Sequence, residues 1–264
     1  MGHSRATGAA ARRPALLVIA AATALSVAAS ATRADTVRIY AAGAAQGVVL
    51  RLEPEFAQVS GHRLDTVFDT VGALRQRVLA GETPDVVILS GAGMAALEQA
   101  GRIDAGSAAD LGSIFVALAV RKGAAVPDVA SSPDALKRAL LAAASIAHAD
   151  PARGATAGTH FASVLQRLGL ATELGARVTV LPFGGDVIEG VAQGRFEIGV
   201  SQSSEIIAHP GVTLAGGLPP PYQHRTRYLA AKVAGAGAGA EAFLQLLRGP
   251  HGRAALVALG FEQR

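Results

Sequence analysis

The chain has 264 residues, of which 50% are hydrophobic and only 17% are charged, so it can bury the core of one large α/β unit or of two lobes. It contains no cysteine, which excludes disulfide scaffolds, cysteine nucleophiles and thiolate metal sites, and its 4% aromatic content argues against platforms for stacking bases or sugars. The formal net charge of +4 would suit a nucleic-acid partner, but this charge comes from the first segment of the chain.

Residues 1–34 have the features of a secretory signal. Arginines precede an uncharged apolar run at 15–29, and small residues then offer cleavage after Ala31 or Ala34. The run is shorter than the roughly 20 residues that a bilayer span needs, and a signal anchor is the alternative interpretation. Four arginines lie in this segment, so the remaining chain holds 20 basic and 20 acidic residues. We therefore expect an exported, periplasmic protein with no nucleic-acid partner.

Strand and helix patterns alternate directly after the signal. Strands are predicted at 36–43, 62–68 and 85–91, and helices at 47–61, closed by Gly61, and at 71–82. The run at 85–91 is continuously apolar, as a strand buried on both faces of a parallel sheet requires. This order predicts right-handed crossovers and a doubly wound sheet.

The same alternation returns in the middle of the chain. Strands are predicted at 113–123, 145–150, 177–182 and 196–201, and helices at 131–143, 155–170 and 185–194. At the end of the chain, the pattern predicts a turn-rich segment at 210–228, a strand at 228–233, and helices within 234–249 and at 251–259. We expect this part of the chain to return to the first lobe. We predict a two-lobed α/β fold in which each lobe is a mainly parallel sheet flanked by helices, with lobe 1 at 35–117 plus 217–264 and lobe 2 at 118–216.

Several common catalytic and cofactor motifs are missing. The sequence has no phosphate-binding P-loop, and Gly91-Ala92-Gly93 lacks the third glycine of a dinucleotide fingerprint. Ser201, Ser203 and Ser204 follow a strand but do not stand in the frame of a nucleophile elbow. The seven histidines show no zinc-binding spacing. We expect no cofactor and no metal.

The informative feature is a set of turns at which a predicted strand leads into a helix through small or hydroxyl residues. They are Ala42-Gly43-Ala44, Asp69-Thr70-Val71-Gly72, Thr156-Ala157-Gly158 and Gly184-Gly185-Asp186. Ligands of open α/β sheets bind outside the carboxyl ends of the strands, and helix N-termini offer unpaired N–H groups to anions. Each turn alone is ordinary strand–helix chemistry, but their recurrence in both halves favours a cleft.

The order of these segments resembles the periplasmic molybdate-binding family of ABC-transporter solute receptors, which has the type II periplasmic binding fold. The resemblance covers nearly all of the chain after the signal. It rests on six stretches: RIYAAGAA (38–45), TVGAL (70–74), AGETPDVVILSG (80–91), ADPARGATAG (149–158), IGVSQSSE (198–205) and AFLQLLRGPHGRAALVALGF (242–261).

The resemblance implies a monomeric receptor that closes on a small anion and delivers it to a membrane ABC transporter permease. Its ligand-binding residues would be Gly43, Ala44, Thr70, Val71, Thr156, Ala157, Asp186 and Gln202. Two serine hydroxyls and a tyrosine of the family fall on Ala44, Val71 and Gln202, while main-chain donors do not depend on the side chain. An oxyanion with fewer donors loses roughly 1–3 kcal/mol for each unsatisfied group, which argues against molybdate. We expect a small anion, either an oxyanion or an organic acid, and Val71 and Gln202 suit a carboxylate ligand with some apolar surface.

An enzyme on the same scaffold is the alternative, because exported aconitate isomerases resemble this receptor family. Proton transfer needs a positioned base, and the candidates are Asp150, His148, His160 and Asp186. Arg153, Arg225, Arg227 and Lys122 are candidates for a carboxylate clamp, with solvated surface charge as the other interpretation. A third possibility is an adhesion or regulatory module without a ligand.

Overall fold

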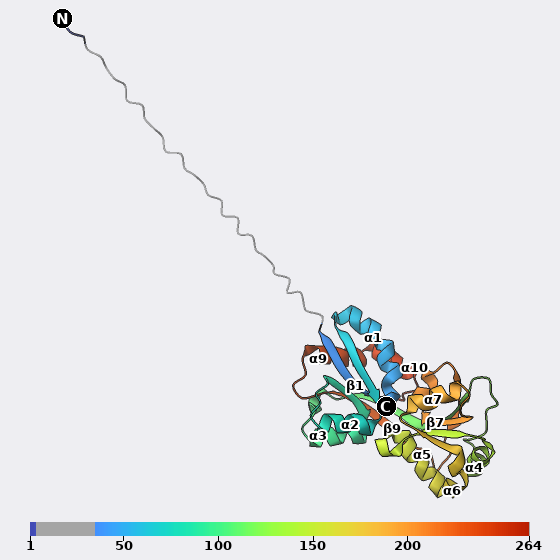
Figure 1. Ribbon diagram of the computed structural model, residues 1–264. Coiled ribbons are helices and arrows are strands. Elements are labelled where there is room, and N and C mark those ends of the chain that lie inside the picture. Colours follow the sequence, from blue (N-terminus) through green and yellow to red (C-terminus); the bar gives the residue numbers. More distant parts are fainter. Residues whose placement is uncertain (4–34, 264) are drawn as a thin grey trace. The chain divides into compact units, whose positions relative to one another are not determined.

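The computed structural model describes residues 1–3 and 35–263 (Figure 1). The predicted signal segment lies outside the described residues, apart from residues 1–3, and every feature below belongs to the unit Ala34–Arg264. In the part that the structure describes, no helix combines the length and the apolar character that crossing a membrane requires.

Nine strands of the described chain form the framework. They are β1 (Thr36–Ala42), β2 (Arg63–Asp69), β3 (Val86–Ser90), β4 (Ala109–Arg121), β5 (Ile146–Ala149), β6 (Val178–Leu181), β7 (Ile198–Gln202), β8 (Val212–Gly217) and β9 (Arg225–Lys232). Their order is β2-β1-β3-β9-β4-β7-β5-β6, and β8 pairs with β4. β2, β1 and β3 are parallel to one another, as are β7, β5 and β6, whereas β9 and β8 join antiparallel.

Helices connect and cover these strands. The α-helices are α1 (Gln46–Ser60), α2 (Val71–Leu79), α3 (Gly91–Gln99), α4 (Pro133–Ala142), α5 (Thr156–Arg167), α6 (Ala171–Leu174), α7 (Gly184–Ala192), α8 (Ser203–Ala208), α9 (Ala238–Arg248) and α10 (Pro250–Ala258). Short 3-10 turns stand at Gly43–Ala45, Ala105–Ser107, Pro151–Arg153 and Gly175–Arg177. Around β1 and β3, helices α1, α9 and α10 lie on one face and α2 and α3 on the other (Figure 1).

Local sequence explains why these elements form. All five residues of β3 are buried, as the continuous apolar run predicts for a strand covered on both faces. α1 ends at Gly61, which adopts the left-handed conformation that glycine reaches without strain (φ 71°). α4 starts where Ser132 accepts a hydrogen bond from the backbone N–H of Ala135, with Pro133 in the first turn.

The buried clusters of the described residues separate into two regions, in agreement with the two-lobed α/β class. One cluster draws its residues from 37–114 and 228–261, and a second large cluster with two smaller ones draws from 116–218. β4 passes from one to the other: residues 109–115 pair with β9, and residues 116–121 pair with β7 and β8. The lobe boundaries at 117/118 and 216/217 stay a prediction, although the cores change close to them.

The structure corrects three details of the sequence interpretation. The segment 210–228 is not only turn: it contains β8, which pairs with β4, and the first four residues of β9. Its glycines and prolines follow a short apolar stretch that the sequence pattern did not resolve as a strand. Helices α3 and α8 were not predicted either, although Ser90 caps α3 by accepting a hydrogen bond from Gly93.

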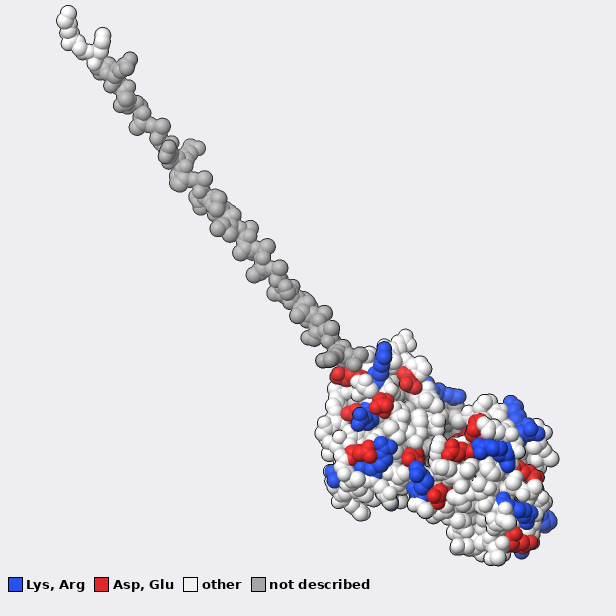
Figure 2. Space-filling model, viewed as in Figure 1, with Lys and Arg blue, Asp and Glu red and all other residues white. Residues whose placement is uncertain are grey.

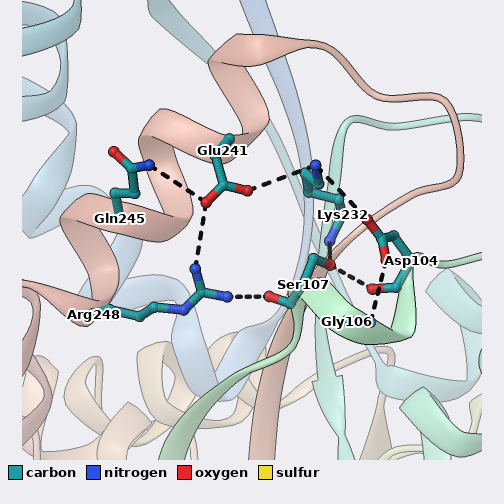
Figure 3. Close-up of polar contacts among 7 residues, drawn as sticks. All are labelled: Asp104, Gly106, Ser107, Lys232, Glu241, Gln245 and Arg248. Carbon is teal, nitrogen blue, oxygen red and sulfur yellow. Dashed lines mark hydrogen bonds and ion pairs between the residues drawn. The ribbon is translucent and has the colours of Figure 1, made fainter.

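A polar network fastens α9 to β9 and to the turn before β4 (Figure 3). The ammonium of Lys232 lies 3.8 Å from Asp104 and 3.6 Å from Glu241, and the guanidinium of Arg248 lies 3.5 Å from Glu241. Arg248 also donates to the carbonyl of Ser107, whose hydroxyl accepts from the backbone N–H of Lys232. Partly exposed ion pairs contribute little to the free energy of unfolding individually. Because these residues connect α9 with β9 and with the turn before β4, we assign the network as a whole to holding the C-terminal helices in place.

Candidate ligand-binding site

The four predicted turns meet at one cavity. A hollow with about 30 Å³ of free volume lies where the carboxyl ends of β1, β2, β5, β6 and β7 come together, and each of the four turns contributes lining residues. This volume is far below the roughly 300–1,000 Å³ of most ligand pockets, so the walls lie close together in this structure. Because the turns come from both lobes, the cavity lies between them.

Seven of the eight predicted ligand-binding residues line this cavity: Gly43, Ala44, Thr70, Val71, Thr156, Ala157 and Gln202. The eighth, Asp186, lies instead on a neighbouring, wider hollow of about 540 Å³ between α1, α7, α8 and α10. The reason is its position on α7: Gly184 begins the helix and lines the first cavity, whereas Gly185 and Asp186 line the second.

Main-chain N–H groups at helix starts are donors at the cavity. The first N–H groups of a helix have no partner within the helix. Among the described residues, no side chain caps α5, α7 or the 3-10 turn at Gly43–Ala45. Three helix starts therefore present open donors and a partial positive charge to the cavity.

The Thr70 hydroxyl, by contrast, is already occupied. It caps α2 by accepting a hydrogen bond from the backbone N–H of Ala73 (3.1 Å), and it donates to the carbonyl of Arg153 (2.5 Å). Both of its roles are structural, so it does not replace the serine hydroxyl that the resemblance leads one to expect beside it at Val71.

Gln202 is a buried polar side chain of the cavity with unmet hydrogen-bonding capacity. It is 3% exposed and stands at the N-cap of α8 in a capping-box arrangement with Glu205, yet within the described residues its Oε1 and Nε2 atoms make no hydrogen bond of normal length and angle. Leaving buried polar atoms unpaired costs about 1–3 kcal/mol, and native proteins rarely do so without a bound partner. An amide on the cavity wall offers one donor group and one acceptor group to a ligand.

Three further polar side chains of the cavity were not predicted as site residues: Ser201, Glu205 and Tyr228. The Ser201 hydroxyl donates to Glu205 Oε2 (2.5 Å), which also accepts from the backbone N–H of Gln202 (3.2 Å). Burial raises the pKa of Glu205. Glu205 ends the stretch IGVSQSSE, so the resemblance contained a signal for it.

Tyr228 comes from the return strand β9 and is 1% exposed. Burial, and then the carboxyl of Glu205, raise the pKa of its phenol well above the ordinary value, with Thr156 and Gln202 partly offsetting the rise. The hydroxyl therefore stays protonated and can donate. No local motif marks this residue, because only the sheet brings β9 beside the turns.

The two lobes touch beside the cavity. Arg153 Nη2 pairs with both carboxylate oxygens of Asp69 at 2.7 and 2.9 Å, and the backbone N–H of Gly72 donates to the carbonyl of Gly154 (3.2 Å). Elsewhere at the junction the Ser204 hydroxyl donates to the carbonyl of Ala44 (2.7 Å). These contacts bridge the lobes, so they belong to the closed arrangement.

Comparison with known proteins agrees with this geometry. The sequence pattern of the family described as "Bacterial extracellular solute-binding protein" matches residues 37–262. The chain belongs to this family of extracellular solute-binding proteins. The predicted resemblance to molybdate receptors is thus confirmed at the level of the wider family and of the fold.

Individual relatives of this solute-binding protein carry different names. A Pseudomonas protein named aconitate isomerase is 32% identical over 204 residues, which is 75% of this chain and 76% of the relative. The periplasmic molybdate-binding protein of Azotobacter vinelandii has a similar structure (TM-score 0.71, 21% identity, 86% of this chain and 99% of that chain). So does a sulfate-binding protein of Mycobacterium tuberculosis (TM-score 0.66, 18% identity, 86% of each chain).

The candidate bases predicted from the sequence do not line the cavity of this solute-binding protein. Buried His148 bonds through Nδ1 to the carbonyl of Ala149, and burial lowers its pKa. His160 contacts the carbonyl of Tyr222, and Asp150 caps the turn that follows β5. Asp186, as noted, lines the neighbouring hollow.

The predicted arginine clamp is not formed within the cavity either. Arg153, Arg225 and Arg227 pair with Asp69, Glu262 and Asp110, and none of the three arginines, nor Lys122, lines the cavity. Positive and negative side chains are interspersed on the face seen in Figure 2. Within the described residues, no group of three or more His, Asp or Glu side chains is arranged to hold a metal ion.

Proposed function

We propose that this solute-binding protein captures a small organic anion between its lobes and passes it to an ABC transporter permease. One observation carries the proposal: helix starts from both lobes converge on a single cavity beside the unpaired amide of Gln202. Convergent main-chain donors bind anions without a cation or a metal.

Carboxylates suit this cavity better than tetrahedral oxyanions. Ala44, Val71 and Gln202 stand where the molybdate family has hydroxyls, and the hydroxyl of Thr70 is engaged elsewhere. Alanine and valine side chains on the wall fit the carbon skeleton of an organic acid, while Gln202 and the helix starts suit its carboxylate groups. The relative named aconitate isomerase makes aconitate the first probe to test.

The test is a binding panel on the purified protein. Thermal denaturation and calorimetry would compare trans-aconitate, cis-aconitate and citrate with molybdate and sulfate. A ligand at one hundred times its Kd stabilises the fold by about 2.7 kcal/mol, which for a protein of this size raises Tm by roughly 5–10 °C. We expect at least one carboxylate to do so and molybdate to have no effect. A flat response to the whole panel would contradict the proposal.

Export and the oligomeric state are further parts of the proposal. The family is extracellular by description, and we infer that the chain reaches the periplasm and loses its first residues after Ala31 or Ala34. Intact-mass measurement of the protein from the periplasmic fraction should then show a chain that starts at Thr32 or Asp35. Light scattering should give the mass of a monomer. A full-length chain retained in the membrane would point to the signal anchor.

An isomerase is the second candidate, and two observations favour it: the relative named aconitate isomerase, and a carboxyl on the cavity wall whose pKa is raised by burial. Moving a double bond requires a group that takes a proton from one carbon and returns one to another, and Glu205 is placed in the cavity to do this. Proton NMR of trans-aconitate with the protein decides the question. Conversion of trans-aconitate by the wild type that is lost in Glu205→Gln supports the isomerase function. If micromolar protein gives no conversion, the isomerase function is rejected and the receptor function remains.

A further inference from the structure

Glu205 occupies an unusual place for an acidic residue in an anion site. It lies in the first turn of α8 and lines both the cavity and the neighbouring hollow. A Cβ atom added to Gly43 would stand 2.7 Å from Glu205 Oε1, and one added to Gly184 would be closer still. The carboxyl therefore lies directly against two of the helix starts that we propose for the ligand.

The two oxygens of the Glu205 carboxyl have different surroundings. Ser201 Oγ and the backbone N–H of Gln202 both donate to Oε2, and Oε1 faces Gly43 and Gly184. Neither donor carries a charge. Burial raises the pKa of Glu205, and the two hydrogen bonds to Oε2 only partly oppose this rise.

Among the described residues that line the cavity, no cation offsets a second negative charge. The other titratable side chains that line the two hollows are Asp69 and Tyr228 in the first, and Arg51, Asp186, Glu189 and His209 in the second. Asp69 is paired with Arg153, Tyr228 is neutral, and Glu189 is paired with His209. Arg51 lines the second hollow but not the cavity. Among the elements packed against α8, β7, β8 and the 3-10 turn at Gly43–Ala45 have no titratable side chain. The charged residues Asp110 and Arg121 of β4, and Glu53 and Glu55 of α1, line neither hollow.

An anionic ligand and an ionised Glu205 would therefore stand side by side in a poorly solvated space, which is strongly unfavourable. Protonation removes the repulsion and converts the carboxyl from an acceptor into a donor. A protonated Glu205 would complement Gln202 and the helix starts, since all of them could then donate to the same carboxylate.

We propose that the site takes up one proton on Glu205 with each carboxylate anion that it binds. This inference rests on the proposed function, because it concerns the same cavity and the same class of ligand. Binding is then linked to pH: affinity is constant where Glu205 is already protonated in the free protein, and falls tenfold for each pH unit above that range.

Calorimetry with trans-aconitate tests the proposal. Titrations at pH 8 in phosphate and in Tris, whose ionisation heats differ, give the number of protons taken up per ligand. We expect close to one proton for the wild type. For Glu205→Gln we expect none, together with retained binding and an affinity that no longer changes between pH 6 and pH 9. Glu189→Gln, on the wall of the second hollow, is the matched control and should keep the uptake.

Binding of trans-aconitate without proton uptake, or an unchanged pH slope in Glu205→Gln, would overturn the coupling while leaving the receptor function intact. If no probe binds, the proposed function fails, and the coupling, which rests on it, fails with it.

Discussion

Replacing Gly72 by alanine tests whether the lobes must close for a ligand to be held. Gly72 is the second residue of α2 and faces the turn after β5 in the other lobe. A Cβ atom at this position would stand 2.5 Å from the carbonyl oxygen of Arg153 and 2.7 Å from the Cα atom of Gly154. Both atoms belong to the backbone, so the clash is relieved only if the lobes separate.

The expected loss follows from the contacts that separation breaks. These are the hydrogen bonds from Thr70 to Arg153 and from Gly72 to Gly154, each worth about 1 kcal/mol, and the ion pair between Asp69 and Arg153, worth roughly 0–1 kcal/mol at this exposure. Together they make about 2–3 kcal/mol. A ligand that selects the closed form should bind about 30- to 140-fold more weakly. Folding should not suffer, because alanine is about 1 kcal/mol better than glycine within a helix.

Two measurements separate closure from general damage. Calorimetry with trans-aconitate gives the affinity, and Gly175→Ala is the control, since that exposed glycine has open space around it and an ordinary φ of −48°. The chain has no cysteine, so spin labels on Ala95→Cys and Lys137→Cys report the distance between the lobes without background. An affinity and a distance distribution for Gly72→Ala that both match the wild type would refute the reasoning.

Four other substitutions have expected outcomes that differ in direction. Gln202→Leu should raise the free energy of unfolding by about 1–3 kcal/mol, measured by urea denaturation, and should weaken ligand binding. Thr226→Val is the control, because it removes the other buried polar atom that has no partner among the described residues. It should stabilise the fold without changing the affinity for the ligand. Arg153→Gln should weaken binding of an anion up to about fivefold in low salt and less in high salt, because it breaks the pair across the lobes. Equal affinities in calorimetry at low salt would contradict this. Glu82 has its pKa lowered from 4.5 to about 2, first by Arg77, so it stabilises the fold above about pH 4.5 and loses this effect as the pH falls towards 2. The Tm difference between wild type and Glu82→Gln should therefore shrink over that range; a constant difference would show that the charge does not matter.

The arrangement of strands and helices was largely predictable from local pattern. The five buried residues of β3 and the cap at Ser132 depend on neighbours in sequence, and the structure confirms both. β8 was not predicted, because its apolar stretch is short and is followed by glycines and prolines that are typical of turns. It becomes a strand because β4 extends beyond β9 and offers it an edge, which is a contact distant in sequence.

The site was predictable where it depends on the main chain. Turns such as Ala42-Gly43-Ala44 reveal themselves by small residues at the mouth of a helix, and all four meet at the cavity. Side-chain roles were harder to predict. The hydroxyl of Thr70, a predicted ligand-binding residue, caps α2. Asp186 lies on the next hollow because successive residues of a helix point about 100° apart around its axis.

Tyr228 shows most clearly what a motif cannot reveal. Comparison with the molybdate family places a missing tyrosine at Gln202 on β7, which suggests a cavity without that hydroxyl. The structure brings the phenol of Tyr228 to the same cavity from β9, on the other side of β4. A ligand then meets an amide from one strand and a phenol from another, with the carboxyl of Glu205 between helix starts of both lobes. Because the main-chain donors are common to any anion, these three side chains are the ones able to distinguish a carboxylate from a tetrahedral oxyanion.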